Sequence, residues 1–130
     1  MKKQAEQWLK YSKVDLLTIE KIKCDKLLTQ SSAFHAHQSV EKSLKALLEN
    51  KNCKVLKTHD LELLLGKVIE MYPELEVDLD LLDKLNQVYI DSRYPSDFGL
   101  LPGGIPTINQ IDELYIYASV VFSLVEDLIG

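Results

Sequence analysis

The residues best suited to chemistry stand close together in the segment 91–95, Asp-Ser-Arg-Tyr-Pro. Arg93 carries a planar fork of N–H donors that matches a phosphate or a carboxylate, and Tyr94 carries a ring face suited to stacking. Pro95 fixes the backbone of the turn that presents both side chains. We therefore interpret Arg93 and Tyr94 as candidate nucleotide or anion contacts. The same residues also fit a helix C-terminus in which Arg93 pairs with Asp91, Asp97 or Asp15.

The three histidines fit structural roles as well as binding roles. His35 and His37 are two residues apart, which places them about 200° apart around a regular helix, so they cannot hold one metal ion together. His37 falls on an apolar stripe and is expected to be a hydrogen-bonded core residue. His35 falls on a polar stripe with Lys42 and Lys45, where these three side chains either face solvent or contact an anionic or nucleotide ligand. For His59, capping, packing and binding all stay open.

Several kinds of catalytic or cofactor site are excluded by residue types alone. The chain has no Walker-type phosphate loop, no GxGxxG segment that opens a helix and no HExxH pair. Its two cysteines, Cys24 and Cys53, have no neighbours at metal-binding spacing and fit buried or incidental thiols of a cytosolic protein. We therefore expect no metal site, no catalytic residues of a standard type and no cofactor, with a nucleotide as the candidate ligand.

The element that must position the histidines and lysines is a central helix over residues 33–48. Its apolar residues recur at three- and four-residue steps, which predicts one stripe facing a core. They are Ala33, Ala36, Val40, Leu44, Leu47 and Leu48. Glu41 and Lys45 stand one turn apart in the favourable order, which predicts a surface ion pair worth about 0.3 kcal/mol.

A first helix is expected over about residues 3–28. Its apolar face is formed by Ala5, Trp8, Ser12, Leu16, Ile19 and Ile22. Asp15 lies one residue from that face and is expected to point to solvent, the alternative being a place at the core edge with a basic or hydrogen-bonding partner. The polar turn 29–32 is expected to supply hydroxyl N-caps to the central helix.

Two further helices are expected in the middle of the chain. The third begins at Thr58 as its N-cap and ends before Pro73, with Asp60 in the first turn, where a carboxylate suits the positive end of the helix. The fourth runs from about Leu82 to about Arg93, because Pro95 cannot continue it. Residues 74–80 are acidic and have few apolar side chains, so they are expected to form a linker between the two helices.

The last part of the chain combines a long apolar loop with a very apolar helix. The loop, residues 96–106, is the longest in the domain, and loops of this kind are often functional or form interfaces. Thr107 and Gln110 have the spacing of a capping box and open the last helix. Because this helix is apolar on more than one stripe, we expect it to bury one side in its own core and the other against a second subunit.

The length and composition of the chain predict one domain over residues 1–130. The chain is 46% hydrophobic, enough for a compact core without disulfides. Its net charge of −5 argues against a general nucleic-acid binder. The charge is uneven, however: residues 1–67 carry 13 Lys and Arg against 8 Asp and Glu, or +5, and residues 68–130 carry 2 against 12, or −10. The front half fits an anionic ligand and the back half a basic partner, although solvated faces of different sign would give the same split.

The patterns together predict an all-α protein. No strand alternation of useful length, internal repeat or low-complexity tract is present, so the expected fold is an antiparallel up-and-down bundle of four to five helices. No signal-peptide pattern and no apolar run long enough for a membrane span is visible, which favours a cytoplasmic protein without membrane contact.

Three motifs, in this order, resemble the HEPN domain family. They are FHAHQSVEKSLKALL at residues 34–48, THDLELL at 58–64, and Tyr89 followed by SRYP at 92–95. Residues 8–16 are also similar to the first helix of that family, so the resemblance covers essentially the whole chain. It implies an antiparallel helical bundle that dimerises and is typically encoded with a minimal (MNT-type) nucleotidyltransferase. Such pairs look like toxin-antitoxin systems or nucleotide-binding modules.

The chain departs from the family at one point that matters for activity. Many HEPN domains are metal-independent ribonucleases that use an Arg-x4-6-His motif across the dimer. Counting from Arg93, the positions of the histidine hold Phe98, Gly99 and Leu100, and no histidine follows His59. Arg93 alone can bind phosphate, but the general acid or base for phosphodiester cleavage is missing.

The resemblance therefore implies a homodimeric subunit that binds a nucleotide, RNA or a nucleotidyltransferase partner and has no catalytic residue of its own. One alternative is a HEPN ribonuclease that recruits His35, His37 or His59 in place of the missing histidine. A second alternative is a structural dimer in which the last helix and the apolar loop form the assembly surface.

Overall fold

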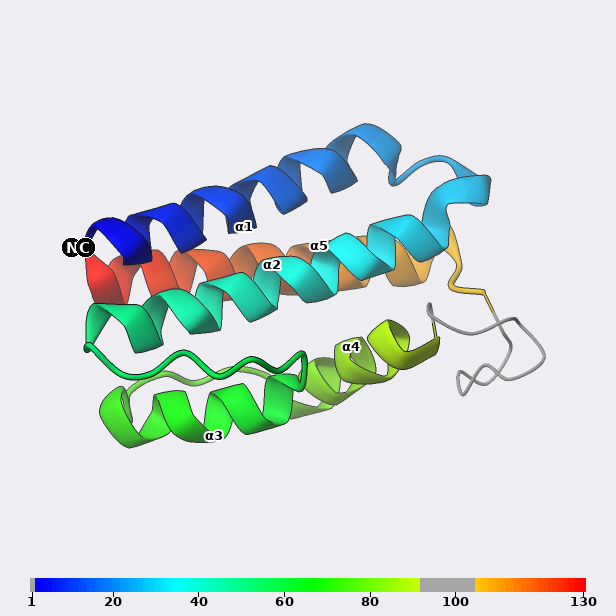
Figure 1. Cartoon of the computed structure of the whole chain (residues 1–130). Coiled ribbons are helices and arrows are strands. Elements are labelled where there is room, and N and C mark those ends of the chain that lie inside the picture. Colours follow the sequence, from blue (N-terminus) through cyan, green and yellow to red (C-terminus); the bar gives the residue numbers. More distant parts are fainter. Residues whose placement is uncertain (1, 92–104) are drawn as a thin grey trace.

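The computed structural model describes residues 2–91 and 105–130, and it is helical throughout (Figure 1). Its elements are α1 (Lys3–Ile22), a short 3-10 helix η1 (Lys26–Leu28), α2 (Thr29–Asn50), α3 (Leu61–Met71), α4 (Leu79–Asp91) and α5 (Ile108–Ile129). The described ranges contain no strand. This confirms the predicted all-α helical bundle.

Helix α2 lies at the centre and contacts α1, α3, α4 and α5. Figure 1 shows α1 antiparallel to α2 on one side and α3 and α4 on the other, while α5 runs in the same direction as α2. The predicted apolar stripe of α2 is confirmed, because all six of its residues are buried. Close packing of α1 on α2 is helped by Ser12, whose buried hydroxyl lies 2.8 Å from that of Ser39 and 2.9 Å from that of Ser43.

The junction of α1 and α2 differs from the prediction. Helix α1 ends at Ile22 rather than near residue 28, and α2 already begins at Thr29, so the expected polar turn is the first turn of α2. Leu28 is the N-cap of α2 and makes no side-chain capping bond. The reason is that η1 leads directly into α2, which turns the hydroxyls of Thr29 and Ser32 into the interior, where neither oxygen has a hydrogen-bond partner among the described residues.

Helix α3 is capped by Asp60 and not by Thr58. The Asp60 carboxylate accepts hydrogen bonds from the backbone N–H groups of Glu62 and Leu63 at 3.0 and 3.3 Å, whereas the Thr58 hydroxyl accepts from the N–H of Asp60. The helix ends at Met71, before Pro73 as predicted.

The remaining boundaries agree in part. Helix α4 begins at Leu79, three residues earlier than predicted, because the Asp78 carboxylate accepts from the N–H of Leu81 and starts the helix there. The capping box of Thr107 and Gln110 at the start of α5 is confirmed. The predicted end of the fourth helix at Arg93 and most of the predicted loop lie outside the described residues.

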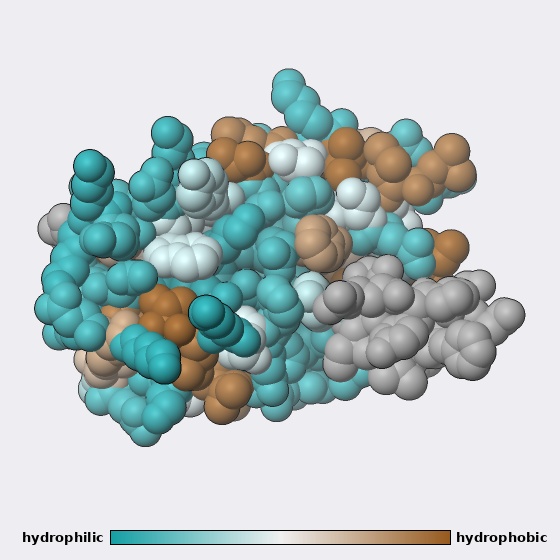
Figure 2. Space-filling model, viewed as in Figure 1, coloured by the Kyte–Doolittle hydropathy of each residue, from teal (hydrophilic) through white to brown (hydrophobic). Residues whose placement is uncertain are grey.

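Large apolar side chains are exposed on α1, η1, α3, α4 and α5. On α1, Tyr11, Val14 and Leu17 are exposed, and Figure 2 shows apolar side chains along this helix above a largely hydrophilic face. On α5, Ile116 and Val120 are exposed. Within the described ranges, no helix combines the length and apolar character that crossing a membrane requires.

Candidate functional site

Two buried carboxylates organise the polar side chains of α2. The first belongs to Asp15 of α1, which accepts from the Nδ1 of His35 at 2.8 Å on one oxygen and from the Nζ of Lys42 at 2.8 Å on the other. We call these three residues the Asp15 cluster. The expectation that Asp15 points to solvent is wrong, because its side chain faces α2 and is nearly enclosed, and the alternative with a basic partner at the core edge is confirmed. His35 and Lys42 stand in front of it and are partly exposed.

The second carboxylate belongs to Glu41 of α2. Its Oε2 accepts from the Nζ of Lys45 at 3.0 Å, and its Oε1 accepts from the Nδ1 of His59 at 2.8 Å. The prediction of a surface ion pair is wrong, because the side chains of Glu41 and Lys45 are only 4% and 8% exposed. Trp8 of α1 covers the lysine, whose Nζ lies 5.5 Å from the centre of the indole ring. We call Glu41, Lys45, His37 and His59 the Glu41 cluster.

His37 is the innermost member of the Glu41 cluster. It is fully buried, and its Nε2 donates to the backbone carbonyl of His59 at 2.9 Å, which confirms the predicted hydrogen-bonded core histidine. Burial lowers the pKa of His37, and the nearby Glu41 carboxylate opposes this effect only in part. The imidazole of His37 therefore stays neutral down to a lower pH than that of a free histidine.

An aromatic group joins the end of α4 to the Glu41 cluster. The ring of Tyr89 stacks on that of His37, with 4.4 Å between centres, and lies 4.9 Å from His59 and 6.0 Å from Phe34. Helix α4 therefore brings its C-terminal turn against the start of α2, and the segment 91–95 follows it in the sequence.

His59 is the member of the Glu41 cluster that reaches the surface. Its side chain is 51% exposed. Because Glu41 binds Nδ1, the other ring nitrogen, Nε2, points away from the carboxylate, and it has no hydrogen-bond partner in the described part of the chain. A carboxylate that fixes the tautomer and orientation of an exposed imidazole is a common arrangement in sites that bind or transfer protons.

The structure separates the residues proposed from the sequence. His35 and Lys42 come together on Asp15, while Lys45 belongs to the Glu41 cluster and is covered. Arg93 and Tyr94 lie outside the described residues, so their roles stay predictions. The sequence did not reveal that Asp15 and Glu41 each bind two side chains, because nothing in their sequence positions distinguishes them from ordinary surface acids.

These clusters combine carboxylates with lysine and histidine side chains. In residues 2–91 and 105–130, no group of three or more His, Cys, Asp or Glu side chains is arranged to hold a metal ion. What the clusters can do chemically is bind an anion through partly exposed N–H donors, or exchange a proton at His59.

The chain is thus an all-helical domain with two clusters of charged and polar side chains along its central helix. The chain belongs to the HEPN domain family, whose model matches residues 2–128. This is a family of nucleotide-binding and ribonuclease type. The chain is also similar to an archaeal HEPN homologue of known crystal structure, with 21% identity, full coverage of both chains and a TM-score of 0.69. At this identity the likeness shows the fold alone. No curated protein matches the chain.

Proposed function

We propose that this protein is a nucleotide-binding HEPN subunit that acts as a homodimer with a partner protein. The expected partner is a minimal nucleotidyltransferase, in a pair of toxin-antitoxin type. The observation that carries the nucleotide-binding part is the Asp15 cluster, in which one buried carboxylate holds two partly exposed nitrogen groups next to each other.

The Asp15 cluster has donors left for a phosphate. The Lys42 ammonium has three N–H donors and uses one of them on Asp15. His35 uses its Nδ1–H on the other oxygen of the same carboxylate, so Lys42 supplies the free donors of the cluster. Because Asp15 orients these side chains before a ligand arrives, less conformational entropy is lost on binding. Arg93 and Tyr94 are the additional contacts that the sequence suggests.

The test is calorimetric titration of the protein with ATP, GTP, CTP and UTP. Lys42→Met keeps the aliphatic stem and removes the donors, and we expect at least tenfold weaker binding of the preferred nucleotide, or about 1.4 kcal/mol. Lys10→Met, on an exposed position of α1, is the matched control and should leave binding unchanged. Arg93→Ala should also weaken binding. Equal affinity of wild type and Lys42→Met would remove the Asp15 cluster from the site.

The partner is tested separately. We expect purification of the native complex, followed by mass spectrometry, to recover a nucleotidyltransferase together with this chain. Light scattering should give the mass of a dimer for the isolated protein. A dimer that shows no thermal shift with any of the four nucleotides would instead support a purely structural role.

One observation favours a second candidate, a metal-independent ribonuclease. The family's Arg-x4-6-His pattern is absent, but the Glu41 cluster presents the Nε2 of His59 with its ring fixed by a carboxylate, as a general base requires. If this candidate is right, labelled RNA is cleaved in the presence of EDTA, and His59→Gln lowers the rate at least a hundredfold while His35→Gln does not. Absence of cleavage, or cleavage that is independent of His59, would rule out this mechanism.

A further inference from the structure

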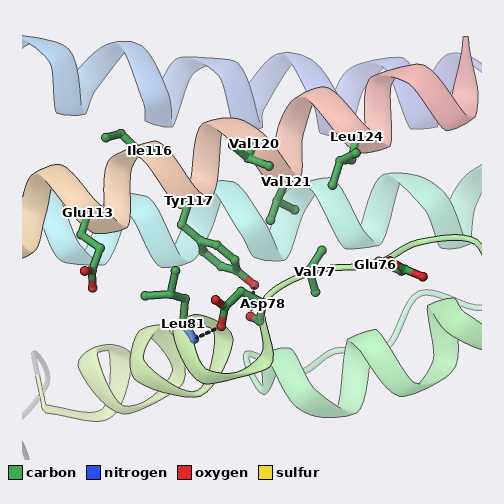
Figure 3. Close-up of a pocket in the computed structure, with 10 residues that line it drawn as sticks. All are labelled: Glu76, Val77, Asp78, Leu81, Glu113, Ile116, Tyr117, Val120, Val121 and Leu124. Atoms are coloured by element: carbon green, nitrogen blue, oxygen red, sulfur yellow. Dashed lines mark hydrogen bonds between the residues drawn. The ribbon is translucent and has the colours of Figure 1, made fainter.

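An apolar groove lies between α5 and the segment 76–81, which leads into α4 (Figure 3). Its volume is about 430 Å³, within the range of small ligand sites. The apolar lining is provided by Val77, Leu81, Ile116, Val120, Val121 and Leu124. Figure 3 shows the α5 side chains on one wall and those of the segment 76–81 on the other, with Tyr117 between them.

A hydrogen bond crosses the floor of the groove. The hydroxyl of Tyr117 donates to the backbone carbonyl of Asp78 at 2.8 Å and so ties α5 to the start of α4. Burial, with the nearby Asp78 carboxylate as a second cause, raises the pKa of Tyr117, which keeps this donor protonated. This bond joins the two walls, which favours a groove that is formed before a partner binds.

The wall formed by α5 carries apolar side chains that the monomer leaves in water. Ile116 is 61% exposed and Val120, one helical turn further on, is 50% exposed. Large aliphatic groups that adjoin an apolar groove are typical of surfaces that bind another protein.

The charge around the groove has one sign. Its charged lining residues are Glu76, Asp78 and Glu113, and no basic residue lines it. Lys84 offsets Glu113 at 3.3 Å, and Asp78 caps α4, but Glu76 makes no ion pair with any described residue. Helix α5 contains four acidic residues and no Lys or Arg.

The end of α5 is acidic as well. Glu126 and Asp127 lie in its last turn, where the helix dipole is negative, and that turn has no basic residue. Acids in this position are unfavourable, because like charges meet there. A cationic partner that lies along α5 would relieve this repulsion.

The charge also argues against a second copy of this chain in the groove. A two-fold contact of α5 with itself would bring its four acids near the same acids of the other copy. Docking of the basic half of one copy onto the groove of the next would be head-to-tail, which leads to an open chain of molecules unless it closes into a ring.

We infer that the groove between α5 and the segment 76–81 binds a basic amphipathic helix of another protein. Aliphatic side chains of that helix, at spacings of three and four residues, would enter the groove beside Ile116 and Val120, and its Lys or Arg side chains would face Glu76 and the acidic end of α5. The inference rests on the proposed function in one respect: the helix belongs to the proposed partner protein.

The experiment uses the full chain and two fluorescein-labelled 18-residue peptides. Both have leucines at the same helical positions, and the polar positions are lysine in one and glutamate in the other. Fluorescence anisotropy should show saturable binding of the lysine peptide and at least tenfold weaker binding of the glutamate peptide. Val120→Asn should weaken binding of the lysine peptide tenfold or more, because it places an amide on the apolar wall.

Val14→Asn is the matched control, since Val14 is also 50% exposed in the middle of a helix, but on α1. It should change peptide affinity by less than twofold. Glu76→Gln should reduce both the affinity and its dependence on salt. Equal binding of the two peptides, or equal loss in the Val14 and Val120 variants, would overturn the inference. So would a homodimer that Val120→Asn dissociates, because the groove would then be a self-association surface.

Nucleotide titrations of the same samples distinguish this inference from the proposed function. Loss of peptide binding in Val120→Asn with normal nucleotide affinity is the expected result. A protein that binds the lysine peptide but no nucleotide would refute the nucleotide site and leave the groove standing.

Discussion

A single carboxylate, that of Glu41, neutralises the covered ammonium of Lys45 and orients His59. We expect Glu41→Gln to lower the free energy of unfolding by about 3 kcal/mol, because it leaves a buried charge without its counter-ion. Urea denaturation followed by circular dichroism measures this loss. Glu49→Gln on the same helix is the control and should stay within about 0.5 kcal/mol of wild type.

The double variant Glu41→Gln with Lys45→Met checks the cause. Removal of both charges should recover part of the lost stability, since an apolar replacement of a buried pair is far less costly than a broken pair. If the two losses of unfolding free energy simply add in the double variant, the two charges act independently.

The buried His37 predicts how stability depends on pH. Its folded-state pKa lies below the ordinary value of 6.5, so the unfolded chain binds a proton more readily than the native protein. The neutral His37 therefore contributes to the free energy of unfolding. This contribution is fully present above pH 6.5 and is lost as the pH falls below it, by at most about 1.4 kcal/mol per pH unit. Urea midpoints between pH 7.5 and 5.5 should fall less steeply in His37→Gln than in wild type. Identical slopes would contradict the prediction.

Ser32 offers a gain in stability. Its hydroxyl is buried without a hydrogen-bond partner in the described part of the chain, and burial of such a group costs about 1–3 kcal/mol. Ser32→Ala should therefore raise the free energy of unfolding by about 1 kcal/mol more than Ser31→Ala does. Ser31 is the exposed neighbour on the same helix turn, so this comparison removes the gain from helix propensity. Equal gains would show that the hydroxyl is hydrated.

At the scale of elements, a side-chain clamp joins α3 to α4. The amide of Asn86 accepts from the N–H of Leu61 and donates to the carboxylate of Asp60, both at 2.9 Å. This hydrogen bond to Asn86 is also the main reason that the pKa of Asp60 is lowered. The cap and the packing of two helices thus depend on each other.

The clamp is tested by a double-mutant cycle. Asp60→Ala should cost about 1–2 kcal/mol of unfolding free energy, as the loss of an N-cap does. Asn86→Ala should be destabilising too, and the double variant should lose less than the sum of the two, because each single variant already breaks their common bond. Strict additivity, measured by urea denaturation, would contradict a coupled clamp.

The clamp also explains which elements could be predicted from the sequence. The apolar stripe of α2 and the capping box of α5 depend on residues a few positions apart, and both are confirmed. Thr58 and Asp60 are both good N-caps, and Asp60 is favoured through Asn86, which lies 26 residues further along the chain. Likewise, the spacing of Glu41 and Lys45 is typical of an ion pair on the surface of a helix. The pair is buried because Trp8 and His59, which are distant in the sequence, pack over it.

In the candidate site, too, only features that depend on residues close together in the sequence could be predicted. His37 was predicted as a core residue because it shares a helical stripe with apolar neighbours, which is a local pattern. The Asp15 cluster combines residues from two helices, 20 and 27 positions apart, so no local pattern contains it. The groove similarly depends on the distance between α5 and the segment 76–81, which the sequence does not specify.

At the scale of the whole molecule, α2 is the common neighbour of the four other α-helices. We expect the described helices to unfold in one cooperative transition, because each of the other four packs more extensively on α2 than on any other helix. Trp8 is the only tryptophan and reports on α1, whereas ellipticity at 222 nm reports on all helices. The two urea curves should coincide, and Leu44→Ala, at a buried position of α2, should shift both equally, by about 2–5 kcal/mol. Separate transitions would show that α3 and α4 form an independent unit.

The two buried carboxylates have a consequence for how such chains change during evolution. Asp15 serves His35 and Lys42 at once, and Glu41 serves Lys45 and His59 at once. A substitution of either acid removes the hydrogen-bond partner of two side chains in a single step, while a change of one of those side chains leaves the acid with the other. Related chains should therefore vary at these lysines and histidines one at a time, and should lose each acid only where both of its partners have already been replaced.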